Sequence, residues 1–209
     1  MTSRLKTDKV SSVLHKGVSL MTCIMAITDG ENMVIGGDSA GVAGLRLTVR
    51  KDPKVFIRED RSGTEWLFGF TSSFRMGELI QYELALPEIK KSNTEDLYGF
   101  MVKEFIPAVR KCFKDGGYAR KKDDEESAGT FLVCLLGRIF EIEGDYQVGE
   151  PMDNFAAVGC AEDVAKGSLY TTEGRVKSSL KRAQMALEAA ERFSGGVRAP
   201  FVILESKPS

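Results

Sequence analysis

Two short apolar runs joined by a polar turn constrain the fold of this chain more than any other feature. The stretch 22–38 holds both runs, and the turn between them reads Asp29-Gly30-Glu31-Asn32. An Asp-Gly pair between apolar runs is typical of a β-hairpin. Because the strands of a hairpin run antiparallel, we expect Asp38, which ends the second run, to return close to the start of the first.

Further strand patterns come in pairs separated by polar turns. Residues 54–57 and 65–70 flank one such turn, and residues 130–136 and 138–143 are divided at Gly137. These patterns predict two more hairpins. Shorter strand patterns lie at 146–148, 156–159 and 200–204, and residues 39–53 predict a loop with room for one further short strand.

Helical patterns lie between these groups of strands. The first follows a cap at Thr71-Ser72-Ser73 and ends before Pro87, and the second opens at Asn93 or Thr94 and stops at Gly116-Gly117. Pro107 lies inside the second pattern and predicts a kink or a break. Residues 161–171 and 178–193 predict two more helices, and the mixed charges of 119–127 predict a solvated loop.

The order of these elements indicates the fold class. Strands, two helices, strands, two helices and a last strand follow one another, without the alternation of a parallel Rossmann sheet. We expect an α+β fold with two mainly antiparallel sheets packed together and a helix pair on each outer face. This is a four-layer αββα sandwich.

Length and composition narrow the function. The chain has 209 residues and a net charge of −1, which indicates one domain with or without a tail, and gives no reason to expect nucleic acid or an anionic membrane as partner. No apolar run reaches the roughly 18–20 residues of a membrane span. The four cysteines are scattered without CxxC spacing, so we expect reduced thiols in the cytoplasm, and no metal or other cofactor.

The only histidine restricts the chemistry. His15 lies in the polar N-terminal stretch, so the rest of the chain has no imidazole. A Ser-His-Asp, Cys-His or HExxH mechanism therefore has no base in the core domain. If the protein is a hydrolase, its base must be a carboxylate, a lysine or an α-amino group.

Thr22 could supply both a nucleophile and that base if it became the first residue. Residues 1–21 predict a flexible leader, either a propeptide or an extension from an upstream start with Met21 as initiator. Both cases leave Thr22 at the N-terminus, where an α-amino group with a pKa of about 7.7–8.0 could take the hydroxyl proton. The ammonium of Lys54, fixed by Asp38, would favour the neutral amine and stabilise developing alkoxide charge.

Asp38 follows Thr22 by 16 residues, and Lys54 follows Asp38 by another 16. Gly36-Gly37 precedes the aspartate. This arrangement resembles the catalytic Thr, Asp and Lys of proteasome β-subunits and of the bacterial protease HslV. The resemblance implies an N-terminal nucleophile hydrolase domain over 22–209 and a threonine-type peptidase acting on proteins or peptides. It also implies self-association into a ring or stacked rings, often fed by a partner ATPase unfoldase.

The same resemblance assigns supporting roles to three further residues. The segment around Ser72 looks like the one whose backbone N–H binds the oxyanion, although the family usually has Gly-Gly where this chain has Ser72-Ser73. Cys160 stands where the family has a serine that helps to hold the amine and water. Only Ser194 could stand in for a further Asp-and-Ser pair expected after the last helix.

Two other functions fit the same residues. A catalytically silent, proteasome-like structural subunit would keep its leader, and Thr22 would never gain a free amine. An amidohydrolase of the same fold could act on a small amide. Cys23 is a neighbouring thiol, but strand alternation points it to the opposite face from Thr22, where we expect it to pack in the core.

Overall fold

The computed structural model describes residues 22–122 and 125–206, and the expected leader at 1–21 lies outside this part. The chain folds into a mixed structure with several antiparallel sheets. Its strands are β1 (Ile24–Thr28), β2 (Met33–Gly37), β3 (Ala40–Ala43), β4 (Arg46–Val49), β5 (Val55–Glu59), β6 (Glu65–Phe70), β7 (Arg120–Lys122), β8 (Glu125–Ser127), β9 (Phe131–Leu135), β10 (Arg138–Ile142), β11 (Val148–Gly149), β12 (Phe155–Val158) and β13 (Val202–Glu205). Its helices are α1 (Phe74–Glu78), α2 (Leu97–Phe100), α3 (Ile106–Asp115), α4 (Glu162–Thr172) and α5 (Ser179–Phe193).

The three predicted hairpins are confirmed. β1 pairs antiparallel with β2 so that Ile24 faces Gly37, which brings Asp38 back beside the start of β1. β5 pairs with β6, and β9 pairs with β10. Residues 39–53 form a further hairpin of two strands, β3 and β4, where the sequence indicated a loop with at most one strand.

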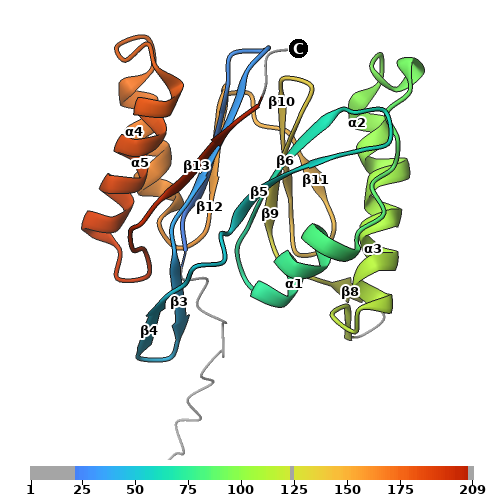
Figure 1. The fold of residues 1–209 in the computed structure, drawn as a ribbon, viewed down its shortest axis with the longest axis horizontal. Helices are drawn as coiled ribbons and strands as arrows, with labels where there is room; N and C mark the ends of the chain where they lie inside the picture. Colours follow the sequence, from blue (N-terminus) through green and yellow to red (C-terminus); the bar gives the residue numbers. More distant parts are fainter. Residues whose placement is uncertain (1–21, 123–124, 207–209) are drawn as a thin grey trace, which may run out of the picture.

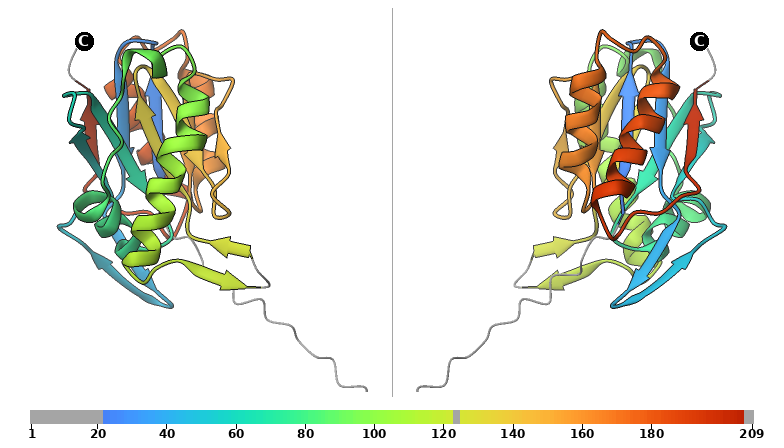
Figure 2. Two further views of the ribbon diagram at one scale, coloured as in Figure 1. Left: turned by 90° about the vertical axis from the view of Figure 1, so that its right-hand side faces the viewer. Right: turned by 90° about the vertical axis from the view of Figure 1, so that its left-hand side faces the viewer.

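Two larger sheets hold most of the strands. One has the order β12-β1-β2-β13, and the other has the order β11-β10-β9-β6-β5. The α4–α5 pair lies against the outer face of the first sheet, and α1, α2 and α3 lie on the far side of the second (Figures 1 and 2). The β3–β4 hairpin extends beyond one end of the sheets.

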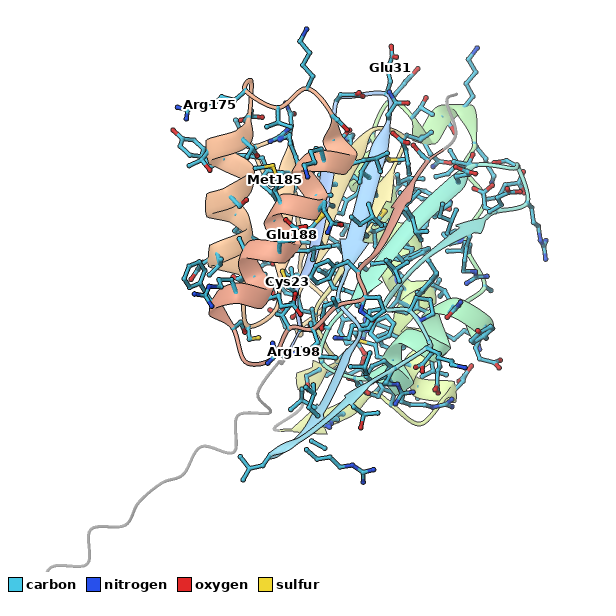
Figure 3. The ribbon with its side chains drawn as sticks, turned by 60° about the vertical axis from the view of Figure 1, so that its left-hand side comes forward. Cys23, Glu31, Arg175, Met185, Glu188 and Arg198 are labelled. Carbon is cyan, nitrogen blue, oxygen red and sulfur yellow. The ribbon has the colours of Figure 1, made fainter. Side chains whose placement is uncertain are left out.

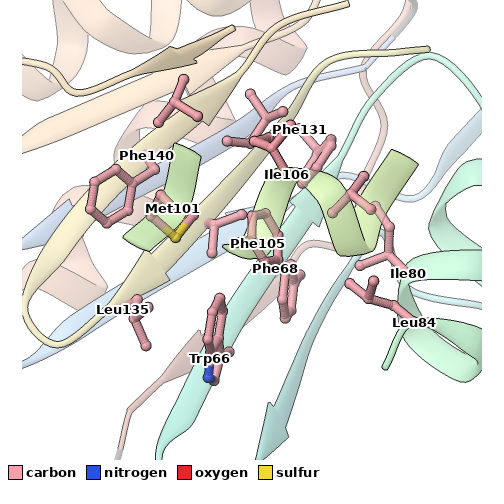
Figure 4. Packing of buried hydrophobic residues seen from close by; sticks show 14 of the residues in the cluster. Trp66, Phe68, Ile80, Leu84, Met101, Phe105, Ile106, Phe131, Leu135 and Phe140 are labelled. Atoms are coloured by element: carbon pink, nitrogen blue, oxygen red, sulfur yellow. The ribbon is translucent and has the colours of Figure 1, made fainter. Parts of the chain in front are cut away.

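Three clusters of buried apolar side chains fill the spaces between the sheets and the helices. The cluster between the two sheets includes Ile24, Ile35, Leu67 and Leu132. The cluster under α4 and α5 is rich in alanine, which lets the helices approach the sheet closely. The third cluster lies between the second sheet and its helices and is strongly aromatic, with Trp66, Phe68 and Phe105 among its members (Figure 4).

Two sequence predictions differ from the structure in detail. Of the kink or break predicted at Pro107, the break does not occur, because residues Met101–Phe105 wind as a π-helical turn that leads directly into α3. Such a wider turn accommodates a residue that lacks an N–H donor. The charged stretch 119–127 is not a simple loop, because β7 and β8 pair there.

The helix caps also differ from the sequence pattern. Ser73 occupies the N-cap of α1 without a side-chain capping bond, whereas Asp96 caps α2 by accepting from the N–H of Gly99. Within the described residues, no helix is both long and apolar enough to cross a membrane.

We predict that Phe68→Ala destabilises the fold strongly. Phe68 is 1% exposed, and its ring stacks on those of Phe56 and Trp66 at centroid distances of 5.5 and 6.0 Å. Removing a buried ring leaves a cavity, so the free energy of unfolding should fall by about 3–5 kcal/mol in urea denaturation. Tyr82→Ala is the control, because Tyr82 is 72% exposed and should change stability by less than about 0.5 kcal/mol. Equal effects of the two variants would contradict the core described here.

Candidate active site

The hairpin of β1 and β2 brings Thr22 and Asp38 together. Thr22 immediately precedes the first strand, and its Oγ1 donates to Asp38 Oδ1 at 2.5 Å. The backbone N–H of Cys23 donates to the same oxygen at 3.0 Å. Strand alternation places Thr22 on the face of Ile24, toward the second sheet, and Cys23 on the opposite face.

Lys54 completes this group from the other sheet. It precedes β5, and its Nζ donates to Asp38 Oδ1 at 2.8 Å and also to Thr22 Oγ1. Glycine at position 37 leaves room where the two sheets approach, because a Cβ there would lie 3.1 Å from Val55 Cγ1 and 2.8 Å from Ile24 Cδ1. Thr22, Asp38 and Lys54 are only 3%, 1% and 3% exposed.

Backbone donors fix the second carboxylate oxygen of Asp38. Oδ2 accepts from the N–H of Ala40 at 2.8 Å and from that of Arg198 at 3.3 Å. The Arg198 donor lies far from Asp38 in the chain, in the segment between α5 and β13, and no motif in the sequence marked it.

Burial dominates the titration of the neighbouring groups. It lowers the pKa of Lys54 below its usual value, while the charge and hydrogen bond of Asp38 act in the opposite direction. Burial, followed by the charge of Asp38, raises the pKa of the Cys23 thiol to about 12. A thiol with that pKa is protonated at neutral pH, so Cys23 is a poor nucleophile.

Gly159 and Cys160 lie against the main chain of Thr22, and Ser194 contacts Cys160. Gly159 has φ +108°, and a Cβ on it would lie 2.3 Å from the carbonyl oxygen of Thr22. Cys160 Sγ donates to that oxygen at 3.5 Å and lies 3.2 Å from Ser194 Oγ. The structure therefore brings Cys160 to Thr22 and Ser194 to Cys160, and the need for glycine at 159 is a feature that the sequence did not reveal.

Ser72 lies apart from this hydrogen-bonded group. Its Oγ accepts from the N–H of Thr130 at 3.2 Å, and within the described residues it has no hydrogen bond to Thr22, Asp38 or Lys54. The strand that leads to Ser72 is nevertheless adjacent, because the N–H of Phe70 donates to the carbonyl of Lys54 at 3.0 Å. Ser72 has φ +64°, a region that favours glycine.

Phe74 and Arg50 form a further wall beside Lys54. The ring centroid of Phe74 lies 6.0 Å from Lys54 Nζ, and the guanidinium carbon of Arg50 lies 3.8 Å from the same centroid. Arg50 also pairs with Asp52 at 2.6 Å. The sequence reading assigned no role to these side chains. No cluster of three or more metal-binding side chains occurs in the part of the chain that the structure describes.

We predict that the buried ion pair is strongly coupled. Lys54→Met leaves the Asp38 carboxylate buried without a cation, so the free energy of unfolding should fall by about 3–5 kcal/mol. Combining it with Asp38→Asn should cost less than the sum of the two single changes, as measured by urea denaturation. Arg75→Met is the control, because its pair with Glu78 is 54% and 51% exposed and should contribute about 1 kcal/mol or less. Strict additivity would contradict a direct pair.

We also predict selective thiol labelling. Cys160 is exposed, whereas Cys23 and Cys134 are fully buried and their pKa values are raised to about 12 by burial. Iodoacetamide at neutral pH should modify Cys160 in the folded protein, and modify the two buried thiols only in denaturant, as peptide mass spectrometry can measure. Labelling of Cys23 in the folded state would contradict this packing.

Comparisons with known proteins address the fold. No family model and no curated protein sequence matches the chain. Similar solved structures include HslV from Trypanosoma brucei, with a TM-score of 0.61 and 19% identity over 88% of this chain and 98% of that one. They also include BPH from Thiobacillus denitrificans (TM-score 0.62, 16% identity, 90% and 99% coverage) and Anbu, an ancestral β-subunit, from Yersinia bercovieri (0.63, 13%, 90% and 82%).

These similarities confirm, for the fold, the resemblance that the sequence suggested. At identities of 13–19% they say nothing about activity. The chain has the fold of these HslV and proteasome-like β-subunit structures.

Proposed function

We propose that the protein is a threonine-type peptidase with Thr22 as its nucleophile. The observation that carries the proposal is the contact of the Thr22 hydroxyl with both Asp38 and Lys54 in a buried site. The activity requires removal of residues 1–21, which gives Thr22 a free α-amino group. That amine accepts the hydroxyl proton as Thr22 Oγ1 attacks the carbonyl carbon of a peptide.

The neighbouring charges have separate roles in this mechanism. The ammonium of Lys54 favours the neutral amine and stabilises the alkoxide as it forms, and Asp38 holds the ammonium at 2.8 Å. Backbone N–H groups near Ser72 bind the oxyanion of the tetrahedral intermediate. The leaving amine departs, an ester to Thr22 remains, and water then hydrolyses it.

Cys160 and Ser194 support the amine of Thr22 in this proposal. Cys160 Sγ lies 3.5 Å from the carbonyl oxygen of Thr22, and Ser194 Oγ lies 3.2 Å from that sulfur. A thiol is a weaker hydrogen-bond partner than a hydroxyl. Ser194 Oγ accepts from the N–H of Gly196 at 3.3 Å, so its place beside the thiol is fixed by the chain after α5.

We extend the proposal to architecture and assembly. We propose that the two sheets and the helices on their outer faces form the four-layer αββα sandwich of this fold. One neighbour is described as the helical assembly of the Anbu complex from Pseudomonas aeruginosa, and we propose that this chain also self-associates. An ATPase unfoldase is the partner to test, and the four free cysteines fit a reducing cytoplasm.

We predict that the purified protein loses residues 1–21 and hydrolyses peptides. Intact-mass measurement should give a chain that begins at Thr22. Thr22→Ala should keep the leader and lower peptide hydrolysis by at least about 10³-fold, because the nucleophile is absent. Thr171→Ala is the control, because Thr171 lies exposed on α4 and its hydroxyl bonds only to backbone carbonyls of its own helix.

Two results would overturn the proposal that the protein is a peptidase. Retention of the leader with no hydrolysis by the wild type would instead support a silent structural subunit. Cleavage of small amides but not of peptides, abolished by Thr22→Ala, would support an amidohydrolase of the same fold.

A further inference from the structure

The tip of the β3–β4 hairpin carries apolar and basic side chains without partners. Leu45 is fully exposed, and Leu47 and Val49 on the same face are 41% and 51% exposed. Arg46, next to Leu45, forms no ion pair with any described residue. An apolar group of this kind beside a free cation is typical of an interaction surface.

A cavity of about 450 Å³ is lined by more acidic than basic side chains, and so differs in charge from the hairpin tip. It lies between α4, β10 and β12 and is lined mainly by Glu141, Pro151, Asp153, Phe155, Lys166 and Tyr170. Lys166 is already paired with Glu162 at 3.3 Å, and Asp153 forms no ion pair with a described residue.

Glu141 also lacks a neutralising partner in this cavity. Its side chain bonds to that of Glu143, and burial together with this like charge raises the pKa of Glu141 to about 7. Lys166 opposes the shift without cancelling it, and Glu162 adds to it. The cavity therefore offers carboxyl groups beside aromatic rings, a combination that favours a bound cation.

Each surface places a very exposed apolar side chain next to a charged residue, and the two charges are opposite. Leu45 and Met152 are the most exposed large apolar side chains in the described part of the chain, at 107% and 100%. Each is followed by a charged residue, Arg46 in one case and Asp153 in the other.

The two surfaces lie at opposite ends of the molecule. The cavity is near the end of β1 where the N–H of Thr28 donates to the carbonyl of Asn154. The hairpin begins at the other end, at Ala40. Figure 3 shows the two ends, with Glu31 of the β1–β2 turn at one and Arg198 toward the other, where the β3–β4 ribbon extends.

We propose that the β3–β4 hairpin of one copy docks into this cavity of a second copy of the chain. Leu45 packs against Pro151 and Met152, and the guanidinium of Arg46 pairs with Asp153 and Glu141 beside the ring of Tyr170. Because the two surfaces differ, the contact is heterologous and repeats from copy to copy, which builds a ring or an open helix. The inference rests on the self-association in the proposed function and is independent of peptidase activity.

Two other cavities are less suited to the hairpin. The one lined by Arg58, Glu59, Asp60, Arg61 and Glu88 holds two guanidinium groups among its carboxylates, and its Asp60 already accepts bonds from several backbone N–H groups. The one beside Ser72 contains Arg120. Arg58 and Arg61 in the first of these cavities and Arg120 in the second would repel Arg46, whereas Lys166 in the cavity beside α4 is paired with Glu162.

Charge reversal tests the contact. Arg46→Glu and Asp153→Arg should each raise the dissociation constant of the wild-type assembly at least about tenfold, measured by light scattering and native mass spectrometry. The double variant restores opposite charges between residues 46 and 153 and should recover assembly. Arg175→Glu is the control for net charge, because Arg175 is exposed and lies outside both surfaces. Circular dichroism should show that all four variants remain folded.

Each other outcome overturns the contact. A monomeric wild type would remove self-association altogether, while peptide hydrolysis by Thr22 is measured separately and could persist. An oligomeric wild type that either single variant leaves intact would assign assembly to another surface. Failure of the double variant to recover would do the same.

Discussion

The ion pair between Lys54 and Asp38 joins the two sheets at the end where the candidate site lies. Burying two charges is costly unless their geometry is good and their remaining hydrogen bonds are satisfied. The structure meets both conditions, since Nζ lies 2.8 Å from Oδ1 and backbone N–H groups occupy the other carboxylate oxygen. Glycine at position 37 permits this approach. The Thr22 hydroxyl is fixed in place because both members of this ion pair are hydrogen-bonded to it.

The elements that carry this pair could be predicted from local sequence. The Asp-Gly turn specified the β1–β2 hairpin, and antiparallel pairing then required Asp38 to return beside Thr22. The position of Lys54 depended on packing between two sheets, which no local pattern encodes. Its expected place came from its spacing within a resemblance, and the geometry agrees with that expectation.

Features that depend on distant segments could not be predicted. The N–H of Arg198 reaches Asp38 across 160 positions, and a backbone donor leaves no signature in residue type. Pro107 normally interrupts a helix, but the π-helical turn before it depends on tertiary packing. The pairing of β7 with β8 was hidden because charged residues have low strand propensity.

The position of Ser72 shows how one departure from the family pattern is accommodated. A serine at φ +64° is less favourable than glycine, and its Cβ needs space. That space exists because residue 129 is a glycine, whose own Cβ would lie 2.7 Å from that of Ser72. The hydroxyl is turned toward the same segment by the N–H of Thr130. The side chain is thus held by its neighbours at 129 and 130, and the backbone of Ser72 keeps the conformation that a glycine would adopt.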